Sequence, residues 1–339
     1  MKAIVQDRYG SPDVLELREI DRPVNGDDQV LVRVHAAGVD QGVWHEVAGL
    51  PYLFRIAGIG VRAPKNPIPG HDVAGTVEAV GEKVTGLRPG DEVFGTCRGP
   101  FAEHACARAD RLAPKPANLS FVQAAAVPTS AATALQALRD KGKVRAGQRV
   151  LIIGAGGGVG TFAVQLAKAY GAEVTGVCST AKTELVRSLG ADHVIDYTKE
   201  DFADGRNRHD IILDIAGNRS LSHLRRALAP EGTLVIVGGE GGGKWFGGID
   251  RQLRAQMLSP FVRQKLGTLI AVARKDDLQV LREFLEAGTV KPVVDRTFAL
   301  SEVAEAIRYL REGRARGKVV VTVELRPGSP RTASPPARL

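Results

Sequence analysis

Long apolar runs, paired cysteines and dense basic segments are all missing from this chain of 339 residues. No stretch offers the roughly 18 uninterrupted apolar residues that a membrane-spanning helix needs, and Lys2, Asp7 and Arg8 place charges where a signal peptide has its apolar core. We therefore expect a cytoplasmic protein without a membrane partner. Cysteines outside a CxxC pair in a reducing compartment are typically small buried side chains, and this chain has three: Cys97, Cys106 and Cys178.

The composition indicates a folded protein with a small excess of positive charge. Hydrophobic residues make up 44% of the chain and charged residues 25%, as in ordinary globular proteins rather than disordered ones. The formal net charge is +8, of which three positive charges are Arg326, Arg331 and Arg338 in a C-terminal stretch without acids. A modest excess without a dense Lys/Arg run favours small anionic molecules as partners, and we expect no nucleic-acid partner.

The order of expected elements divides the chain into a mostly-β module and an α/β module. Short strand patterns, separated by glycine, proline and aspartate, fill the first hundred residues. From about residue 122, strands alternate with helices, which requires a doubly wound parallel sheet, and β patterns return at 293–298 and 318–323. We expect a substrate domain of residues 1–122 completed by 274–325, a dinucleotide-binding domain of 123–273, and a disordered tail of 326–339.

A strand that runs into a cluster of glycines is the strongest chemical signal. The apolar residues 150–153 are followed by Gly154, Ala155, Gly156, Gly157, Gly158, Val159 and Gly160, and a helical pattern follows. Glycines let the backbone approach a pyrophosphate, whose charge then lies on the free amides of a helix N-terminus. The string departs from G-x-G-x-x-G, but the flanking strand and helix and a second strand at 173–177 supply the context of a dinucleotide site. A merely flexible turn is the alternative.

An acidic residue is missing where NAD-binding sites usually hold the ribose 2′-hydroxyl, at the end of the second strand. The chain has Ser179, Thr180 and Lys182 there. Without an acid, a 2′-phosphate is not repelled, and these three side chains can donate hydrogen bonds to it. We therefore expect NADPH as the cofactor; the alternative for Lys182 is a solvent-facing place in the first turn of a helix.

Five further motifs accompany the glycine turn: 36–40 (AAGVD), 69–77 (PGHDVAGTV), 88–93 (RPGDEV), 190–197 (GADHVIDY) and 317–320 (GKVV). Together these motifs resemble the medium-chain dehydrogenase/reductase superfamily, in its zinc-independent quinone oxidoreductase branch. The resemblance covers nearly the whole chain. It implies a GroES-like β module that carries the substrate pocket, a Rossmann domain, and an active cleft between them. It also implies a homodimer formed through an edge strand near residues 266–272.

The metal ligands of the zinc-dependent members of this superfamily are mostly missing. Those members have a cysteine at the position of Asp40, another near Thr129, and a lobe with four more, whereas His71 and Asp72 match their histidine and acid. We therefore expect no metal. A site formed by Asp40, His71 and Asp72 is the alternative, since catalytic zinc takes three protein ligands.

The resemblance also implies roles for single residues. Asp40 stands where the branch commonly has an asparagine near the nicotinamide, and Thr129 matches a threonine at the nicotinamide. Lys182 and Tyr197 match contacts to the adenosine phosphate. The glycine-rich loop 238–248, which begins at Gly238, suggests a mobile cover over the nicotinamide; a disordered surface turn is the alternative.

Aromatic residues are candidate walls of the substrate pocket or plain core residues. They are Trp44, Tyr52, Phe54 and Trp245. The reduced acceptor also needs a proton, and the candidates for its source are Tyr52, His71 and water.

These features predict hydride transfer from NADPH, without zinc, to a small quinone or α,β-unsaturated carbonyl. In such a reaction the cofactor supplies the chemistry and the protein positions the acceptor. Asp40, Tyr52, His71 and Thr129 are the candidate catalytic residues. Two alternatives stay open: a zinc-free alcohol dehydrogenase or aldehyde reductase, and a protein that binds NADPH without turnover.

Overall fold

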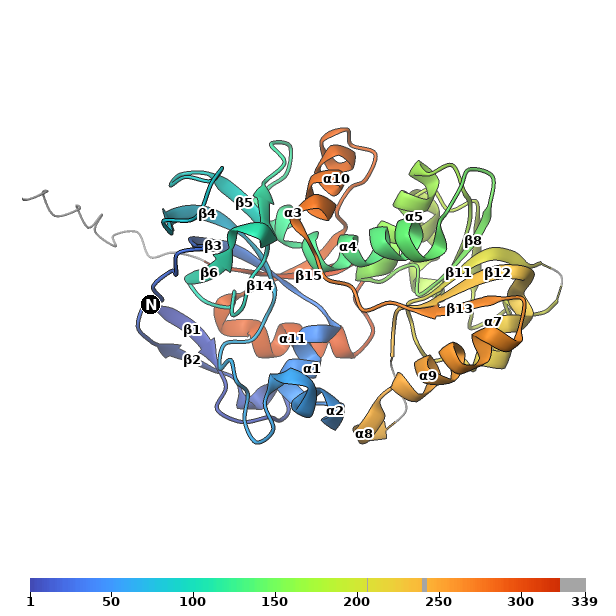
Figure 1. The fold of residues 1–339 in the computed structure, drawn as a ribbon, viewed down its shortest axis with the longest axis horizontal. Coiled ribbons are helices and arrows are strands. Elements are labelled where there is room, and N and C mark those ends of the chain that lie inside the picture. Colours follow the sequence, from blue (N-terminus) through green and yellow to red (C-terminus); the bar gives the residue numbers. More distant parts are fainter. Residues whose placement is uncertain (206, 240–242, 324–339) are drawn as a thin grey trace, which may run out of the picture.

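Two large sheets lie side by side along the longest axis of the molecule (Figure 1). The computed structural model describes residues 1–205, 207–239 and 243–323, so the expected tail of residues 326–339 lies outside the described part. A third, small sheet pairs β1 (Lys2–Val5) with β2 (Glu16–Glu19) in antiparallel register. The chain therefore builds its two main sheets from different stretches of sequence.

The first large sheet takes strands from both ends of the chain. Its order is β14-β15-β3-β4-β5-β7, with β6 paired to β3. The pairs are antiparallel except β14 with β15. The bounds are β3 Gln29–Val39, β4 Asp72–Val80, β5 Glu92–Thr96, β6 His104–Arg108, β7 Leu112–Pro114, β14 Val294–Ala299 and β15 Lys318–Thr322. Because β15 pairs with β3, the C-terminal segment becomes part of the N-terminal sheet.

The second large sheet has six parallel strands in the order β10-β9-β8-β11-β12-β13. This is the doubly wound order of a Rossmann fold. The bounds are β8 Arg149–Ile153, β9 Glu173–Cys178, β10 His193–Asp196, β11 His209–Asp214, β12 Leu228–Ile236 and β13 Lys265–Thr268. The predicted fold class, a Rossmann sheet beside a GroES-like β module, is confirmed.

Helices cover both faces of the parallel sheet, because its central strands are apolar on both sides. In β8, Val150 and Ile152 pack into one core cluster, while Leu151 and Ile153 pack into another. The helix bounds are α1 Gln41–Ala48, α2 Tyr52–Phe54, α3 Phe121–Ala125, α4 Pro128–Gln136, α5 Gly158–Ala169, α6 Thr183–Ser188, α7 Leu221–Ala227, α8 Gly243–Phe246, α9 Ile249–Leu258, α10 Lys275–Glu286 and α11 Val303–Arg311.

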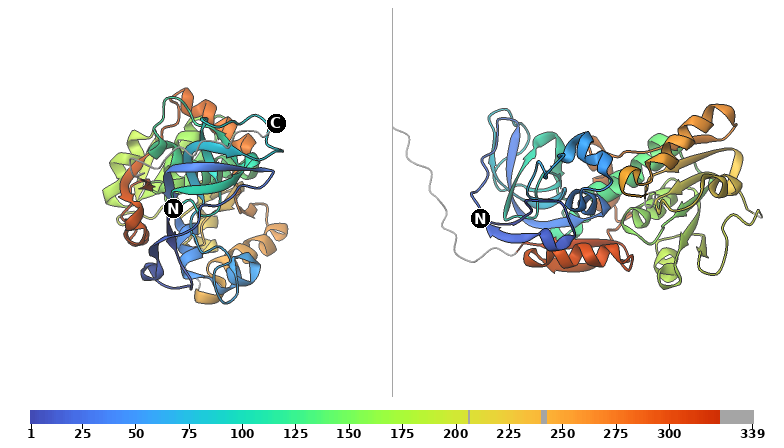
Figure 2. Two further views of the ribbon diagram at one scale, coloured as in Figure 1. Left: turned by 90° about the vertical axis from the view of Figure 1, so that its left-hand side faces the viewer. Right: turned by 90° about the horizontal axis from the view of Figure 1, so that it is seen from below.

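The two domains lie next to each other (Figure 2), and they share a core cluster and a backbone contact. Phe94 of the antiparallel sheet belongs to the same cluster as Leu135 of α4 and Phe162 of α5. In addition, the amide of Gly317 donates to the carbonyl of Gly156 at 3.1 Å. The side of the molecule that carries α4 and α5 is therefore continuous across the domain junction.

Some elements differ from the sequence-based expectation. The helical pattern at 124–141 is divided into α3, α4 and a π-helical turn, because Pro128 has no amide to donate and instead begins α4. The short strands β6 and β7 were not predicted, and the strand expected at 266–272 ends at Thr268. These differences leave the order of the two sheets unchanged.

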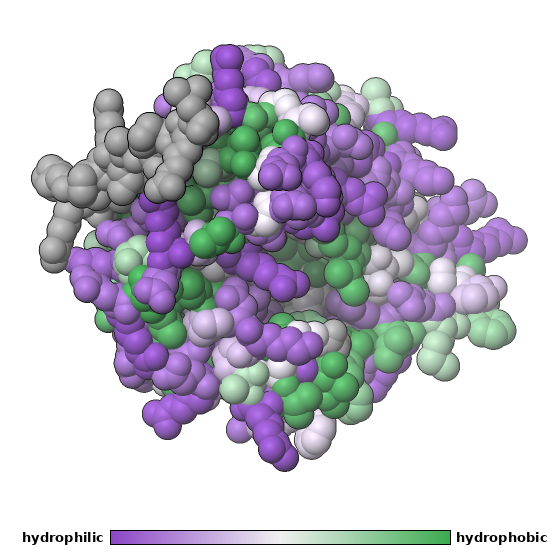
Figure 3. All heavy atoms as spheres, turned by 60° about the vertical axis from the view of Figure 1, so that its left-hand side comes forward, coloured by the Kyte–Doolittle hydropathy of each residue, from purple (hydrophilic) through white to green (hydrophobic). Residues whose placement is uncertain are grey.

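The face shown in Figure 3 is mostly hydrophilic, and its hydrophobic side chains gather in separate patches. Such a mixed face is ordinary for a surface in contact with water. Across the described ranges, no helix combines the length and the apolar character needed to cross a membrane.

Candidate active site

The glycine-rich turn lies between the end of β8 and the start of α5. Gly154 has a φ of +93°, and its amide and that of Ala155 each donate to the carbonyl of Val177 in β9 at 3.0 Å. A Cβ at Gly160 would lie 2.1 Å from the carbonyl oxygen of Gly154, so the turn excludes a side chain there. Gly157, the N-cap of α5, has no side chain to cap the first amides of the helix. Those amides are what a pyrophosphate binds.

A hollow of about 510 Å³ opens beside this turn, between the two domains. The stem of Lys182 packs under the turn, because a Cβ at Gly156 would lie 2.8 Å from its Cβ. Its Nζ donates to the carbonyl of Gly313 at 3.0 Å. Burial lowers the pKa of Lys182, and a bound anion would favour its charged form. The lining residues are Ser179, Ala181, Lys182, Asp295, Arg296, Tyr309, Gly313, Arg314 and Arg316.

The lining of this hollow is basic, with one lysine and three arginines against one acid. That acid, Asp295, accepts a hydrogen bond from the hydroxyl of Tyr309 at 2.7 Å. The guanidinium of Arg296 lies over the same ring, 4.4 Å from its centre. The excess of cations suits a bound phosphate group. It does not suit a ribose hydroxyl, which is usually held by a carboxylate.

Ser179 lines the hollow, whereas Thr180 and Tyr197 have other contacts nearby. Thr180 donates its hydroxyl to Asp196 at 2.5 Å and would have to release it before binding a phosphate. Hydrogen bonds from Thr180 and Thr198 lower the pKa of Asp196 to about 2. Tyr197 is 48% exposed, and its amide donates to the carbonyl of Cys178 at the end of β9 at 3.1 Å. Its ring therefore remains accessible next to the hollow.

A buried lysine connects the glycine turn with the domain junction. Lys318, the first residue of β15, is 1% exposed, and its Nζ donates to Asp72 Oδ2 at 3.2 Å and to Ser130 Oγ at 3.1 Å. Its stem packs on Gly158, where a Cβ would lie 2.9 Å from Lys318 Cδ. Asp72 also accepts from the amide of Thr129 at 2.9 Å. Burial raises the pKa of Asp72, and the ammonium of Lys318 opposes that shift. The ion pair thus holds the starts of α4, α5, β4 and β15 together.

Three of the predicted catalytic residues, Asp40, His71 and Thr129, lie around this junction. Asp40 caps α1 by accepting from an amide of its first turn at 3.2 Å, and its Oδ2 is buried without a hydrogen-bond partner in the described part of the chain. A Cβ at the exposed Gly42 would lie 3.0 Å from Asp40 Oδ1 and 3.9 Å from His71 Cδ2. His71 directly precedes Asp72, which holds Thr129. Asp40 and His71 therefore flank an open stretch of backbone at Gly42.

Glu46 of α1 completes this group and was missed by the sequence analysis. Its Oε1 lies 3.3 Å from His71 Nε2, and its Oε2 accepts from the amide of Gly70 at 3.3 Å. Burial raises the pKa of Glu46, while His71, the Gly70 amide and Arg98 act in the opposite direction. Nothing in the helical pattern of 41–48 separates this glutamate from a solvent-facing one. No group of three or more His, Cys, Asp or Glu residues within the described ranges is arranged to hold a metal ion.

Tyr52, the fourth predicted catalytic residue, packs against an aromatic residue of the other domain. Its ring packs edge-on against Trp245, with 5.2 Å between ring centres, and the guanidinium of Arg55 lies 4.8 Å from its centre. The helices that carry Tyr52 and Trp245, α2 and α8, are neighbours from opposite domains (Figure 1). This aromatic contact bridges the two domains.

The loop 238–248 is fixed at its first residue. The carbonyl of Gly238 accepts from Arg251 Nη2 of α9 at 3.0 Å, and Arg251 also forms an ion pair with the fully buried Asp214 at the end of β11. Residues 240–242 of the predicted cover lie outside the described residues. The described part therefore connects the carboxyl edge of the parallel sheet to α8.

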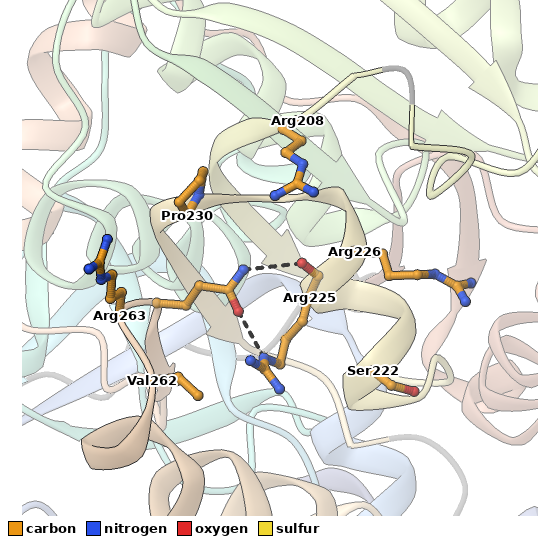
Figure 4. Close-up of a pocket in the computed structure, with 8 residues that line it drawn as sticks. Arg208, Ser222, Arg225, Arg226, Pro230, Val262 and Arg263 are labelled. Carbon is orange, nitrogen blue, oxygen red and sulfur yellow. Dashed lines mark hydrogen bonds between the residues drawn. The ribbon is translucent and has the colours of Figure 1, made fainter.

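A second hollow, of about 520 Å³, lies at the amino ends of β11 and β12 (Figure 4). Arg225 Nε donates to Gln264 Oε1 there at 2.8 Å. Cofactors of doubly wound sheets bind at the carboxyl ends of the strands, so this hollow is separate from the candidate site. Its lining residues are Arg208, Ser222, Arg225, Arg226, Pro230, Val262, Arg263 and Gln264.

The residues of the turn and the hollow fit a dinucleotide, because the uncapped amides of α5 suit a pyrophosphate and the basic lining suits a further phosphate. A turn of this kind at the junction with a second domain defines the class of two-domain dehydrogenases and reductases that bind a nicotinamide dinucleotide.

Comparison with known proteins places the chain within that class. Residues 26–117 match the alcohol dehydrogenase GroES-like domain, and residues 189–321 match a family described as zinc-binding dehydrogenase. The chain belongs to the medium-chain dehydrogenase/reductase superfamily, in its quinone oxidoreductase-like branch.

Two relatives and one solved structure illustrate the similarity. An NADPH-dependent alkenal/one oxidoreductase of Arabidopsis thaliana is 37% identical over 340 residues, which cover 95% of this chain and 79% of that protein. A quinone oxidoreductase of Homo sapiens is 32% identical over 343 residues, covering 95% and 97%. The structure of a quinone oxidoreductase from Coxiella burnetii aligns with a TM-score of 0.83 at 29% identity, covering 96% of this chain and 99% of that one.

Proposed function

We propose that this protein is an NADPH-dependent reductase of quinones or α,β-unsaturated carbonyls that works without zinc. The chain is an enzyme of NAD(P)H-dependent quinone or enone reduction, as the names of its relatives indicate. The observation that carries the proposal is the uncapped glycine turn at the domain junction. The buried pair of Lys318 and Asp72 connects this turn to the substrate domain.

The turn and the basic hollow would hold the pyrophosphate and the 2′-phosphate of the dinucleotide. The amides at the start of α5 face the pyrophosphate position, and Lys182, Arg296 and Arg316 line the place for the 2′-phosphate. When bound, the dihydronicotinamide supplies a hydride. Lys318 connects the turn to the substrate domain through Asp72, which also holds Thr129 and follows His71. Thr129 and His71 are therefore the side chains that position the acceptor.

The preference for NADPH over NADH rests on charge. The hollow has a surplus of cations, and a charge-assisted hydrogen bond to a phosphate is roughly twice as strong as one between neutral groups. A ribose hydroxyl gains no such bond from these residues. We therefore propose that NADPH binds more tightly.

Zinc-free catalysis is the second part of the proposal. Asp40 and Thr129 stand where zinc-dependent members have cysteines, and a thiolate is a strong zinc ligand. We expect elemental analysis of the purified protein to find no stoichiometric zinc, and treatment with EDTA to leave activity unchanged. One zinc per chain, with activity lost to EDTA and restored by zinc, would overturn this part and favour alcohol dehydrogenase chemistry.

The decisive experiment is NADPH oxidation with a panel of quinones, enones, aldehydes and alcohols. We expect kcat/KM to be highest for conjugated acceptors, because conjugation spreads the negative charge that a Lewis acid would otherwise stabilise. A preference for simple alcohols or aldehydes in metal-free protein would assign the alternative enzyme class. Binding of NADPH without turnover of any acceptor would assign a non-catalytic NADPH-binding protein.

A homodimer formed through β13 is also part of the proposal. Within the described sheet, β13 pairs only with β12 and has a free outer edge. Met257, Phe261 and Ile270, on or next to α9 and β13, are 73%, 84% and 87% exposed, and apolar surface of this kind is typical of an interface. Light scattering of the protein should give twice the chain mass, and Ile270→Asp should give monomers.

The domain division and the location in the cell remain proposals. The pairing of β15 with β3 supports a substrate domain of residues 1–122 completed by 274–325, with 123–273 as the cofactor domain. Limited proteolysis should cut near these boundaries. A cytoplasmic location would be tested by cell fractionation.

A further inference from the structure

We propose that His71 donates the proton that completes reduction of the acceptor, and that Glu46 is the positioning residue that holds His71 for this task. The inference rests on the proposed function and identifies the proton source that the sequence leaves open. It is carried by the contact of Glu46 Oε1 with His71 Nε2 at 3.3 Å and by the partial exposure of the His71 side chain.

The backbone and the side chain of this pair are both fixed. The carbonyl of His71 accepts from the amide of Cys97 at 2.8 Å, and the second oxygen of Glu46 accepts from the amide of Gly70 at 3.3 Å. Glu46 thus contacts the histidine ring and the residue just before it. A carboxylate held in this way fixes the orientation of the imidazole.

The His71 side chain is also accessible to a ligand. It is 36% exposed, so a substrate can approach the ring. The residue after His71, Asp72, forms an ion pair with Lys318. The stem of Lys318 packs on Gly158 at the start of α5. The other candidate, Tyr52, packs its ring on Trp245 and under Arg55 instead.

Charged groups around Glu46 include both signs. Asp40 begins the same helix, His71 and Gly70 come from the segment before β4, and Arg98 follows β5. Burial and Asp40 favour the protonated carboxyl, whereas His71, the Gly70 amide and Arg98 favour the carboxylate.

The step balances as follows. The dihydronicotinamide would supply the hydride by losing a C–H bond and would be oxidised to the nicotinamide cation. The hydride forms a C–H bond at the β-carbon of an enone, and the π-electron pair of the C=C bond moves to the carbonyl oxygen. Because Nε2 of His71 faces Glu46, Nδ1 carries the proton that is delivered to the enolate, and its N–H bond breaks. The ring is left neutral with its remaining proton on Nε2, and water returns the lost proton after product release.

Kinetics of three variants test the proposal. In Glu46→Gln, which keeps the size of the side chain, we expect kcat for an enone at pH 7.5 to fall about tenfold with KM changed less than twofold. In His71→Gln we expect a fall of about 100-fold or more. Glu46→Asp should retain part of the activity. Glu173→Gln is the matched control, because Glu173 forms a similar contact with His193 at 3.2 Å on the other domain, outside the cleft.

A second measurement does not depend on turnover. Diethyl pyrocarbonate acylates the neutral imidazole, and its rate at His71 can be followed by mass spectrometry in protein without cofactor. Loss of the Glu46 carboxylate should change this rate, because the imidazole of His71 is then no longer held in one orientation. The rate at His193 should be unchanged by Glu46→Gln. An unchanged rate at His71 would show that Glu46 does not position its ring.

The outcomes separate this inference from the proposed function. If the wild type reduces no acceptor, the proposed function fails and this inference fails with it. If the wild type is active but His71→Gln keeps its kcat and its pH profile, water or Tyr52 supplies the proton and only this inference is wrong. A Glu46→Gln protein that does not fold leaves His71→Gln and Glu46→Asp to decide, with circular dichroism to verify their folding.

Discussion

Lys182→Gln is expected to weaken NADPH binding by about 10- to 100-fold and to leave NADH binding nearly unchanged. A hydrogen bond to a charged group contributes about 1.5–3 kcal/mol, and each 1.4 kcal/mol changes a dissociation constant tenfold. Arg296 and Arg316 remain in the hollow, which favours the lower end of the range. NADH has no 2′-phosphate for Lys182 to contact.

Glutamine is the right replacement because the stem of Lys182 has a packing role. That stem lies against the turn at Gly156, and a glutamine keeps most of it, whereas alanine would also remove the packing. The present contact of Nζ with the Gly313 carbonyl at 3.0 Å joins the two domains. Thermal unfolding without nucleotide should therefore be compared in the wild type and the variant.

Fluorescence titration with NADPH and with NADH is the assay. The matched control is Lys168→Gln, because Lys168 lies on the same domain and pairs with Asp192 at 2.7 Å, away from the hollow. It should bind both nucleotides like the wild type. Equal affinity of the wild type for NADPH and NADH, or an equal loss of both in Lys182→Gln, would refute the assignment of the hollow to the 2′-phosphate.

Three further changes test other parts of the structure. Gly160→Ala should destabilise the fold by about 1–3 kcal/mol and abolish NADPH binding, because its Cβ would lie 2.1 Å from a carbonyl oxygen. At Gly157 the corresponding distance is 3.5 Å, so alanine should be tolerated there. Calorimetry measures the stability of both variants, and titration measures their NADPH binding. Lys318→Met should lower the free energy of unfolding by about 3–5 kcal/mol by leaving the Asp72 carboxylate buried and unpaired, and adding Asp72→Asn should restore part of it in urea denaturation. Burial lowers the pKa of His209 to about 4, so the unfolded chain binds a proton that the native state does not, and the free energy of unfolding should fall between pH 6.5 and 4 by up to about 3 kcal/mol. His209→Gln should remove that part of the pH dependence, and an unchanged dependence would contradict the reasoning.

Sequence patterns predicted the structure best where all the residues of a motif are consecutive in the chain. The glycine turn, its strand and its helix are consecutive, so their spacing alone predicted the start of α5 at the end of β8. The alternation of strands and helices predicted the parallel sheet for the same reason. The role of Pro128 as the first residue of α4 follows from its missing amide.

Contacts between distant residues could not be obtained in this way. Glu46 is an ordinary helical glutamate in the sequence, and only the approach of the segment before β4 places it 3.3 Å from His71. Thr180 was predicted to bind a phosphate, yet its hydroxyl donates to Asp196, which is brought to the same edge by the pairing of β10 with β9. Hydrogen-bond partners of this kind depend on the sheet order.

The sequence by itself determined the fold class, the place of the cofactor turn and the lack of an acid after β9, because these depend on local periodicity and on residue types at fixed spacing. Only the tertiary structure decided that Lys318 is buried against Asp72, 246 residues away in the chain. It also decided that Arg296 and Arg316 join Lys182 in one hollow. A charged residue at a strand end looks the same in sequence whether it faces water or a buried partner, and the difference comes from the packing of one domain against the other.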